Sequence, residues 1–403
     1  MKNQLLVALV SLFPSMAFAG TFTVDIQMGP GADFQEVTDA LSSPLVGDGD
    51  TLLIRPGSYK RVLSSLSVTM RGLGADPSDV NFFGDSWTNS IFEDCTGPIR
   101  FSNLEFRGLY FVNCSQPIHL MDVDLSELNL SDARFVRYEN TVLDTSLFGF
   151  RTTINDSHVE FLNCYLRGAS GGGTAAYVHS YSYARFANCQ FVGGRGDDSS
   201  PWFPYGGDGG AGLHVAQSSR VHLIGKTGNS IQGGGGGYGD SIPEDGAGAP
   251  ALVLGNDCTV RLSNFELVGG WDPENTVQAP GYSGPASALT IALIPDPLMM
   301  RTGSFSPGDM STFFLLGEPG APVIAFFGTQ VTTTPLPGII GALGTNFTSP
   351  FVTGQLNGSG RFSFPVTVPL GIPVGTLATM QSGMIYTSDG STRLTNPTTI
   401  FVQ

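Results

Sequence analysis

The chain has 403 residues, and 41% of them are hydrophobic, which is enough for a long core and excludes a wholly disordered protein. The 54 glycines, 26 prolines and only 13% charged residues favour strands and turns over helices, whose surfaces are normally rich in Lys, Glu and Arg. With 34 acidic and 19 basic residues the net charge is -15, so the surface repels phosphate backbones and we expect no nucleic-acid partner.

The N-terminus has the pattern of a secretory signal peptide. Lys2 precedes an apolar run at residues 5–13, and small residues at Ala17 and Ala19 fit a cleavage site. We therefore assign residues 1–19 to a cleaved signal peptide and expect a secreted or cell-surface protein. No later stretch has the apolar length of a membrane span, so we expect no transmembrane segment.

The residues that follow predict a strand and then a short helix. A strand is expected at residues 22–26, and a helix is expected from Asp33, with Glu36 three residues later as in a capping box. A glycine-aspartate turn then leads into a second strand at residues 51–54. Such a helix would shield the open end of a stacked-strand core.

Two runs in this region carry a family resemblance. The sequence GPGADFQEVTDAL at residues 29–41, followed by GDGDTLLIRPGSY at residues 47–59, resembles the start of right-handed parallel β-helix proteins of the pectin-lyase-like superfamily. The resemblance extends over about the first two thirds of the chain. It implies the β-helical fold more strongly than any activity, because that superfamily includes polysaccharide lyases, glycoside hydrolases, epimerases and secreted proteins without catalysis.

Short repeats from residue 92 onward indicate successive coils. FEDCTGPIRF at residues 92–101 is echoed 19 residues later by FVNCSQPIHL at residues 111–120. Apolar residues five apart at residues 120–135 also fit the quadrilateral β-helix of pentapeptide repeats, which is a local alternative.

Three later repeats align an asparagine at one turn, and these residues are Asn163, Asn188 and Asn264. Asparagine tolerates the left-handed conformation at turns, and its side chain can hydrogen-bond its copy one coil away. We expect a structural role for all three.

The stretch from Gly173 to Ile291 repeats one pattern of apolar pairs. The pairs are Ala176/Val178, Leu213/Val215, Leu252/Leu254 and Leu289/Ile291. Alternation with period two predicts strands with one inward face. Steps of 37, 39 and 37 residues exceed the 25 residues that separate the equivalent positions Phe161 and Phe186, so each coil contains a glycine-rich insertion. Insertions at one corner of successive coils would form a crest along one edge.

Five cysteines are an odd number, so at least one is free or pairs between molecules. Cys95 and Cys114 occupy equivalent repeat positions, as do Cys164 and Cys189. The favoured interpretation is that they stack as small buried side chains. The alternative is a disulfide between adjacent coils, which the roughly 4.8 Å spacing of strands permits.

The composition changes after residue 294. We assign residues 20–294 to the parallel β-helix, residues 295–307 to a linker, and residues 308–403 to a small antiparallel β-sandwich, because short strands there alternate with Gly/Pro turns. The runs GEPGAPVIAFF, GRFSFPVTVPLGIPVGTLATMQ and RLTNPTTIFV resemble a C-terminal module of large exported proteins of some environmental bacteria. That resemblance implies display or packaging, not chemistry.

The glycine-rich crest provides the candidate binding surface. Aromatic faces stack on the C–H faces of sugars, and the candidate ligand-binding residues are Trp202, Tyr205, Tyr238, Trp271 and Tyr282. Convergent carboxylates bind Ca²⁺, and the candidate metal ligands are Asp197, Asp198, Asp208, Asp240, Asp245 and Asp272. The alternative is that the acids only solvate the loops and the aromatic residues cover the loop backbone.

No catalytic signature stands out. Lyases of the resembled superfamily use Lys or Arg as a base and hydrolases use paired acids. His119 with Asp122 and Asp124, and Asp156 with His158, are near one another in sequence, but alternating positions often produce such pairs by chance. We therefore expect an exported, non-catalytic β-helical surface or extracellular protein that binds glycans through its crest, with Ca²⁺ as the candidate cofactor. The alternative is a polysaccharide lyase or glycoside hydrolase acting on an extracellular polysaccharide.

Overall fold

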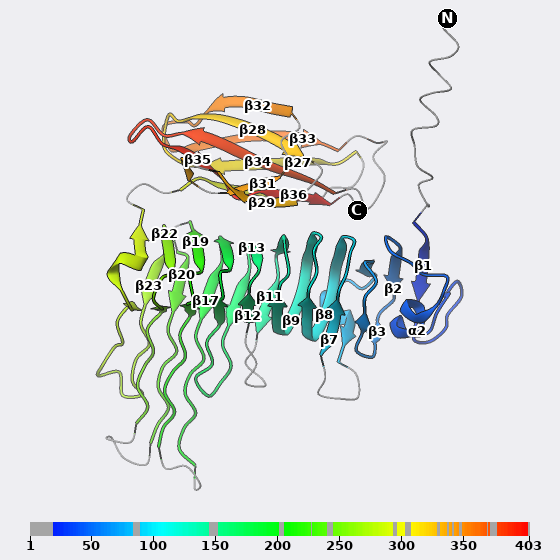
Figure 1. Cartoon of the computed structure of the whole chain (residues 1–403), viewed down its shortest axis with the longest axis horizontal. Coiled ribbons are helices and arrows are strands. Elements are labelled where there is room, and N and C mark those ends of the chain that lie inside the picture. The colour runs from blue at the N-terminus through cyan, green and yellow to red at the C-terminus, as the bar shows by residue number, and fades with distance from the viewer. Residues whose placement is uncertain are drawn as a thin grey trace, which may run out of the picture.

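The computed structural model describes residues 19–83, 89–144, 152–200, 205–226, 228–239, 245–292, 296–302, 308–328, 331–336, 338–340, 342–345, 349–368, 370 and 377–401. Residues 1–18, which the sequence assigns to the signal peptide, lie outside this set. None of the described helices is long and apolar enough to span a membrane. The chain forms an all-β protein with a long parallel β-helix and a smaller domain built mainly of antiparallel strands (Figure 1).

The β-helix has three faces, each a ladder of parallel strands. Face one contains β1 (Thr21–Val24), β2 (Thr51–Ile54), β5 (Thr69–Gly72), β10 (Val136–Glu139), β13 (His158–Leu162), β16 (Tyr183–Ala187), β19 (Arg220–Ile224), β22 (Thr259–Ser263) and β25 (Leu289–Ile291). Face two contains β3 (Gly57–Ser58), β6 (Val80–Phe82), β11 (Val142–Asp144), β14 (Tyr165–Arg167), β17 (Gln190–Val192), β20 (Ser230–Gln232) and β23 (Glu266–Val268). Face three contains β4 (Leu63–Ser64), β7 (Ser90–Glu93), β12 (Thr152–Asn155), β15 (Ala176–His179), β18 (Leu213–Val215), β21 (Leu252–Leu254) and β24 (Tyr282–Ser283).

Two continuous strands, β8 (Ile99–Val112) and β9 (Ile118–Ser131), run through all three faces. Successive parts of β9 pair with β10, β11 and β12, which lie on faces one, two and three. The quadrilateral pentapeptide alternative is therefore wrong. The apolar spacing of five arises because a 19-residue coil turns two corners within one strand, with a left-handed residue such as Asp122 (φ 53°) at the bend.

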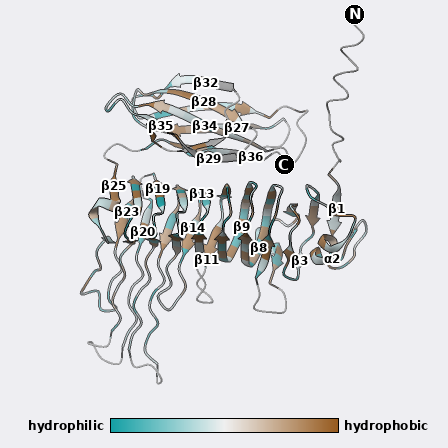
Figure 2. Ribbon diagram, viewed as in Figure 1, coloured by the Kyte–Doolittle hydropathy of each residue, from teal (hydrophilic) through white to brown (hydrophobic). Residues whose placement is uncertain are grey.

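Inward side chains of successive coils stack on one another in the core. The rings of Tyr138, Phe161 and Phe186 lie nearly parallel, with centroid distances of 4.8 and 4.9 Å. Figure 2 shows hydrophobic and hydrophilic residues interleaved along the strands of both domains. Each coil therefore buries its apolar face only against its neighbours, as the repeat predicts.

The register confirms the first three predicted repeats and corrects the fourth. Ala176, Leu213 and Leu252 are paired neighbours in face three. Leu252 then pairs with Tyr282, whereas Leu289 pairs with Val260 on face one. The assignment of Leu289/Ile291 as a fourth copy was wrong, because an apolar pair with period two fits either inward ladder.

The asparagines form the predicted structural ladder. Asn163, Asn188 and Asn264 have left-handed φ angles of 55°, 53° and 59°. Nδ2 of Asn188 donates to Oδ1 of Asn163 at 2.7 Å. In the intervening coil Gly225 occupies the position, so Nδ2 of Asn264 donates to its carbonyl oxygen at 3.2 Å.

The capping helix α2 (Val37–Ser42) exists, but it begins four residues later than predicted. The Asp33 carboxylate accepts a hydrogen bond from the Thr23 amide at 2.7 Å and so holds β1 instead of capping a helix. Val37 and Ala40 of α2 are buried at the start of the core. Two single 3₁₀ turns, η1 (Pro77–Asp79) and η3 (Ala286–Ala288), complete the described helical residues of the domain.

All five cysteines are free and buried, as the stacking interpretation predicts. Sγ of Cys189, for example, donates to the carbonyl oxygens of Phe161 and Ala187 at 3.5 and 3.4 Å. Burial and the neighbouring Cys164 raise the pKa of the Cys189 thiol.

The C-terminal domain has two main sheets. One contains β26 (Leu298–Thr302), β27 (Met310–Leu316) and β33 (Arg361–Thr367). The other contains β28 (Pro322–Gly328), β30 (Ile339–Ile340), β32 (Ser349–Gln355), β34 (Leu377–Ile385), β35 (Thr392–Leu394) and β36 (Thr398–Phe401). Strands β29 (Val331–Pro335) and β31 (Ala342–Thr345) form a separate two-stranded antiparallel sheet. Strand β26 falls within the segment that the sequence assigns to a linker.

This sandwich lies alongside the β-helix and covers part of face one, while the glycine-rich segments project from the opposite side (Figure 1). Leu162, Ala187 and Ile224 of face one pack against Leu298 of β26 in a small buried apolar cluster. The arrangement separates a covered face from an open crest.

Candidate functional site

The crest is a bundle of glycine-rich segments that leave face two and return to face three. Gly210 donates its amide hydrogen to the carbonyl oxygen of Gly194 at 2.8 Å and accepts one from Gly234 at 2.7 Å. Gly234 in turn accepts from Ala249 at 2.9 Å. These bonds join the outgoing and returning arms of one segment and also join one segment to the next, so the crest is held together by its backbone.

Close approach of these backbones explains why the insertions are rich in glycine. A Cβ atom at Gly194 would lie 1.6 Å from the carbonyl oxygen of Ala169. A Cβ atom at Gly234 would lie 1.9 Å from the carbonyl oxygen of Gly194, and one at Gly270 would lie 2.0 Å from that of Gly234. Any larger residue would separate the segments, because real Cβ atoms do not approach oxygen so closely.

A groove of about 360 Å³ opens along the bundle, and two of the predicted ligand-binding aromatic residues line it. Tyr238 and Trp271 are 49% and 42% exposed. The Tyr238 hydroxyl donates to the carbonyl oxygen of Pro273 at 3.0 Å, and the Arg195 guanidinium lies 5.4 Å from the centre of its ring. The hydrogen bond at its hydroxyl and the nearby cation hold the half-exposed Tyr238 ring at the wall of the groove, which is a suitable arrangement for stacking on a sugar ring.

The other predicted ligand-binding residues do not all belong to this groove. Tyr205 is 67% exposed elsewhere on the crest, and Tyr282 is 38% exposed on β24 of face three. Trp202 lies outside the described residues. The structure therefore brings together Tyr238 and Trp271 and does not place Tyr205 or Tyr282 beside them.

The predicted metal ligands bind backbone amides of the crest. The contacts are from Tyr238 N to Asp198, Ala247 N to Asp208, Gly239 N to Asp245, and Thr276 N to Asp272, at 2.6 to 2.9 Å. Hydrogen bonds from Thr276 lower the pKa of Asp272. Asp197 accepts from Gly207 through its backbone oxygen, and Asp240 lies outside the described residues. In the described ranges no three His, Cys, Asp or Glu side chains gather closely enough to hold a metal ion.

Face one carries a second group of polar residues, and the sandwich covers it. An outward ladder runs through His119, Arg137, Glu160, Arg185, His222 and Arg261 on successive coils. Arg137 donates to the carbonyl oxygen of Pro397, and Arg185 donates to that of Leu394 at 3.1 Å. These contacts join side chains of the β-helix to the backbone of the sandwich.

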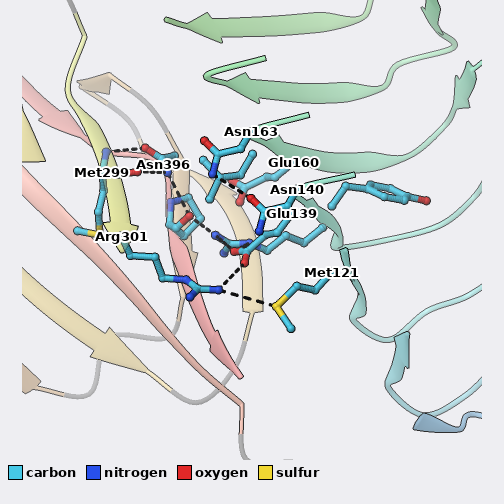
Figure 3. A network of polar contacts seen from close by, with 12 residues as sticks. Met121, Glu139, Asn140, Glu160, Asn163, Met299, Arg301 and Asn396 are labelled. Atoms are coloured by element: carbon cyan, nitrogen blue, oxygen red, sulfur yellow. Dashed lines mark hydrogen bonds and ion pairs between the residues drawn. The ribbon is translucent and has the colours of Figure 1, made fainter. Parts of the chain in front are cut away.

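Figure 3 shows the part of this interface around Glu139. Nη2 of Arg301 lies 3.6 Å from Glu139 and 3.8 Å from the sulfur of Met121. The Asn396 side chain accepts a hydrogen bond from the Met299 amide at 2.7 Å and donates one to the Met299 carbonyl oxygen at 2.8 Å. These bonds hold β26 against the segment between β35 and β36.

Asp296 is the centre of the interface. Its carboxylate binds Arg261 at 2.7 and 2.9 Å, Arg393 at 2.8 Å and Nε2 of His222 at 2.9 Å. Burial alone would raise the pKa of Asp296, but hydrogen bonds from His222 and Arg261 outweigh burial and hold the pKa well below its usual value. Burial lowers the pKa of His222, so the neutral imidazole donates to the carboxylate.

A third site is a groove of about 540 Å³ at the corner between faces one and two. It is lined by Arg71, Asp122 and Asp124, among others. Burial raises the pKa of Asp122, and burial together with the neighbouring Asp122 raises that of Asp124. The sequence analysis identified the two acids as candidates but not Arg71. Arg71 lies beside them only because successive coils stack.

The histidines that the sequence paired with acids do not join this groove. His119 lies beneath the sandwich, where burial lowers its pKa to about 4. His158 is half-buried between the rings of Phe135 and Tyr183, and burial lowers its pKa as well. Both rings therefore have packing roles in this structure.

Comparison with family models, with curated proteins and with solved structures finds no match to this chain. The assignment of function therefore depends on the residues and geometry of the molecule itself.

Proposed function

We propose that this protein is an exported, non-catalytic β-helical protein that binds extracellular polysaccharide through the groove between Tyr238 and Trp271. The observation that supports the proposal best is the pair of exposed aromatic side chains in one open groove, one of them fixed by a hydrogen bond and a cation. The start of the β-helix supports membership of the pectin-lyase-like superfamily as part of the same proposal.

The backbone-held bundle favours binding over chemistry at this groove. Five of the thirteen residues that line it are glycine, and Arg195 and Asp272 are its charged residues. Asp272 already accepts two hydrogen bonds from Thr276, at 2.6 Å from the amide and 2.5 Å from the hydroxyl. A rigid wall with aromatic faces loses little conformational entropy when a glycan binds, which favours affinity without a reaction.

The test is a binding screen of the mature protein against neutral and anionic polysaccharides, followed by Trp271→Ala and Tyr238→Ala. Loss of one stacking contact should weaken binding about tenfold, which corresponds to roughly 1.4 kcal/mol. Tyr181→Asn is a matched control, because Tyr181 is 75% exposed, lies outside the crest and has a left-handed φ of 62° that asparagine tolerates. Equal binding by all three variants would refute the role of the groove.

A second candidate function is a polysaccharide lyase or glycoside hydrolase at the groove of Arg71, Asp122 and Asp124. The observation that favours it is that two acids with raised pKa values line one groove with an arginine. Formation of unsaturated products or reducing ends that Asp124→Asn abolishes would support this function. Product formation that survives Asp124→Asn would contradict it, and Trp271→Ala would leave such activity unaffected if the two sites are independent.

A further inference from the structure

We propose that the cleft between the β-helix and the sandwich binds an anionic amphiphile, a molecule with an apolar body and one negatively charged group. This inference goes beyond glycan binding by the crest and concerns the opposite side of the molecule. The cleft has a volume of about 750 Å³, within the range of small-molecule sites, which lie preferentially between domains.

The floor of the cleft is apolar and continues the buried interface. Leu298 and Leu316 are register partners, as are Met300 and Phe314, so these four side chains share one face of the β26–β27–β33 sheet. Leu298 is buried against the apolar residues of face one. Met300 and Leu316 are partly buried and pack against the same apolar cluster. Phe314 is 36% exposed, so the apolar surface runs from the closed interface to solvent.

The mouth of the cleft is cationic on a protein whose net charge is -15. Lys226 follows β19 of the β-helix, and Arg361 begins β33 of the sandwich, so the two domains contribute one cation each. Both residues are exposed, and neither forms an ion pair within the described part of the chain. Asp296 also lines the cleft, but Arg261 and Arg393 neutralise its carboxylate, and His222 donates a hydrogen bond to it.

The chemistry of the lining therefore selects the ligand. The apolar floor favours an alkyl or ring body, because burial of apolar surface is the main driving force there. The cations favour a carboxylate or a similar anion at the mouth, where charge-assisted hydrogen bonds are about twice as strong as neutral ones. Asn357 and Ser359 of the adjacent turn add neutral polar groups at the rim.

The test uses the full mature protein and compares decanoate with decanol by titration calorimetry, below the concentration at which either aggregates. We expect decanoate to bind with 1:1 stoichiometry and decanol to bind about tenfold more weakly, because it lacks the charge. Equal affinity for the two compounds, or no saturable binding of decanoate, would overturn the proposal.

Variants locate the site. Arg361→Glu and Lys226→Glu should each weaken decanoate binding about tenfold without affecting decanol. Arg220→Glu is the matched control, because Arg220 is exposed at the opposite end of β19 from Lys226. Phe314→Ser should weaken both compounds, whereas Met310→Ser, which changes a 66% exposed residue at the far end of β27, should weaken neither. If the control variants weaken binding as much as the cleft variants, the binding is non-specific and the proposal fails.

Each variant changes a solvent-exposed side chain, so we expect the fold to persist, and circular dichroism checks that it does. Arg361→Gln provides a second variant that removes the charge without reversing it. It should give the same direction of effect, and unchanged decanoate affinity in Arg361→Gln would contradict the role of the cation.

Discussion

Removal of the charge on Asp296 should destabilise the protein strongly, because this carboxylate holds three donors at the domain interface. Its side chain is fully buried, and the side chain of Arg393 is only 4% exposed. Asp296→Asn keeps the shape and one acceptor oxygen but removes the buried negative charge that Arg393 and Arg261 share. Breaking one side of a buried ion pair typically costs 3–5 kcal/mol.

We expect the lower end of that range, about 3 kcal/mol, for two reasons. Arg261 is 27% exposed and can recover water, and Arg393 retains an ion pair with Asp389 and lies over the ring of Tyr386 at 4.1 Å. The neutral His222 requires no counter-charge. The loss should appear first as undocking of the sandwich, since Asp296 joins face one to Arg393 of the sandwich.

The assay is urea unfolding followed by fluorescence, together with limited proteolysis of the native protein. Asp389→Asn is the matched control, because Asp389 binds the same arginine but is 40% exposed, and surface ion pairs contribute at most about 1 kcal/mol. Combining Asp296→Asn with Arg393→Met should recover part of the loss, because the second change removes the buried unpaired charge. If Asp296→Asn costs no more than Asp389→Asn, the reasoning is refuted.

Two further predictions concern His119 and the crest. His119 has a pKa of about 4 when folded, against an ordinary value near 6.5, so the unfolded chain binds more protons between these values. The contribution of His119 to the free energy of unfolding is therefore complete above about pH 6.5 and falls by roughly 3 kcal/mol as the pH drops to 4. His119→Gln should remove this fall, so the free energy of unfolding, measured with urea, should depend less on pH between about 4 and 6.5. An unchanged pH dependence would contradict the lowered pKa of His119. Gly194→Ala should cost about 1–3 kcal/mol through the clash with the carbonyl of Ala169 and should increase hydrogen exchange in the crest, whereas Gly358→Ala, which meets no atom within 4 Å, should be neutral. Equal effects of the two substitutions would argue against a backbone-packed crest.

Local patterns in the sequence were enough to predict the strands of the β-helix and the stacking of its coils. Alternating apolar residues fix which side of a strand faces inward, and equivalent positions in successive repeats must stack because each coil has only its neighbours to bury against. That is why the pairing of Ala176, Leu213 and Leu252 and the ladder through Asn163 and Asn188 could be read in advance. The same pattern could not assign Leu289 to a face, since either inward ladder accepts an apolar pair.

The candidate binding surfaces and the domain interface depended on tertiary structure. Outward charges such as Arg137 and Arg185 have the same alternation whether they face solvent or a second domain, so nothing in the sequence indicated that the sandwich would cover them. Asp296 lay in an expected linker, and its role arises from partners 35 to 97 residues away. The sequence indicated the aromatic residues of the crest, but the groove that unites Tyr238 with Trp271 exists only because glycine lets separate backbones approach within hydrogen-bond distance.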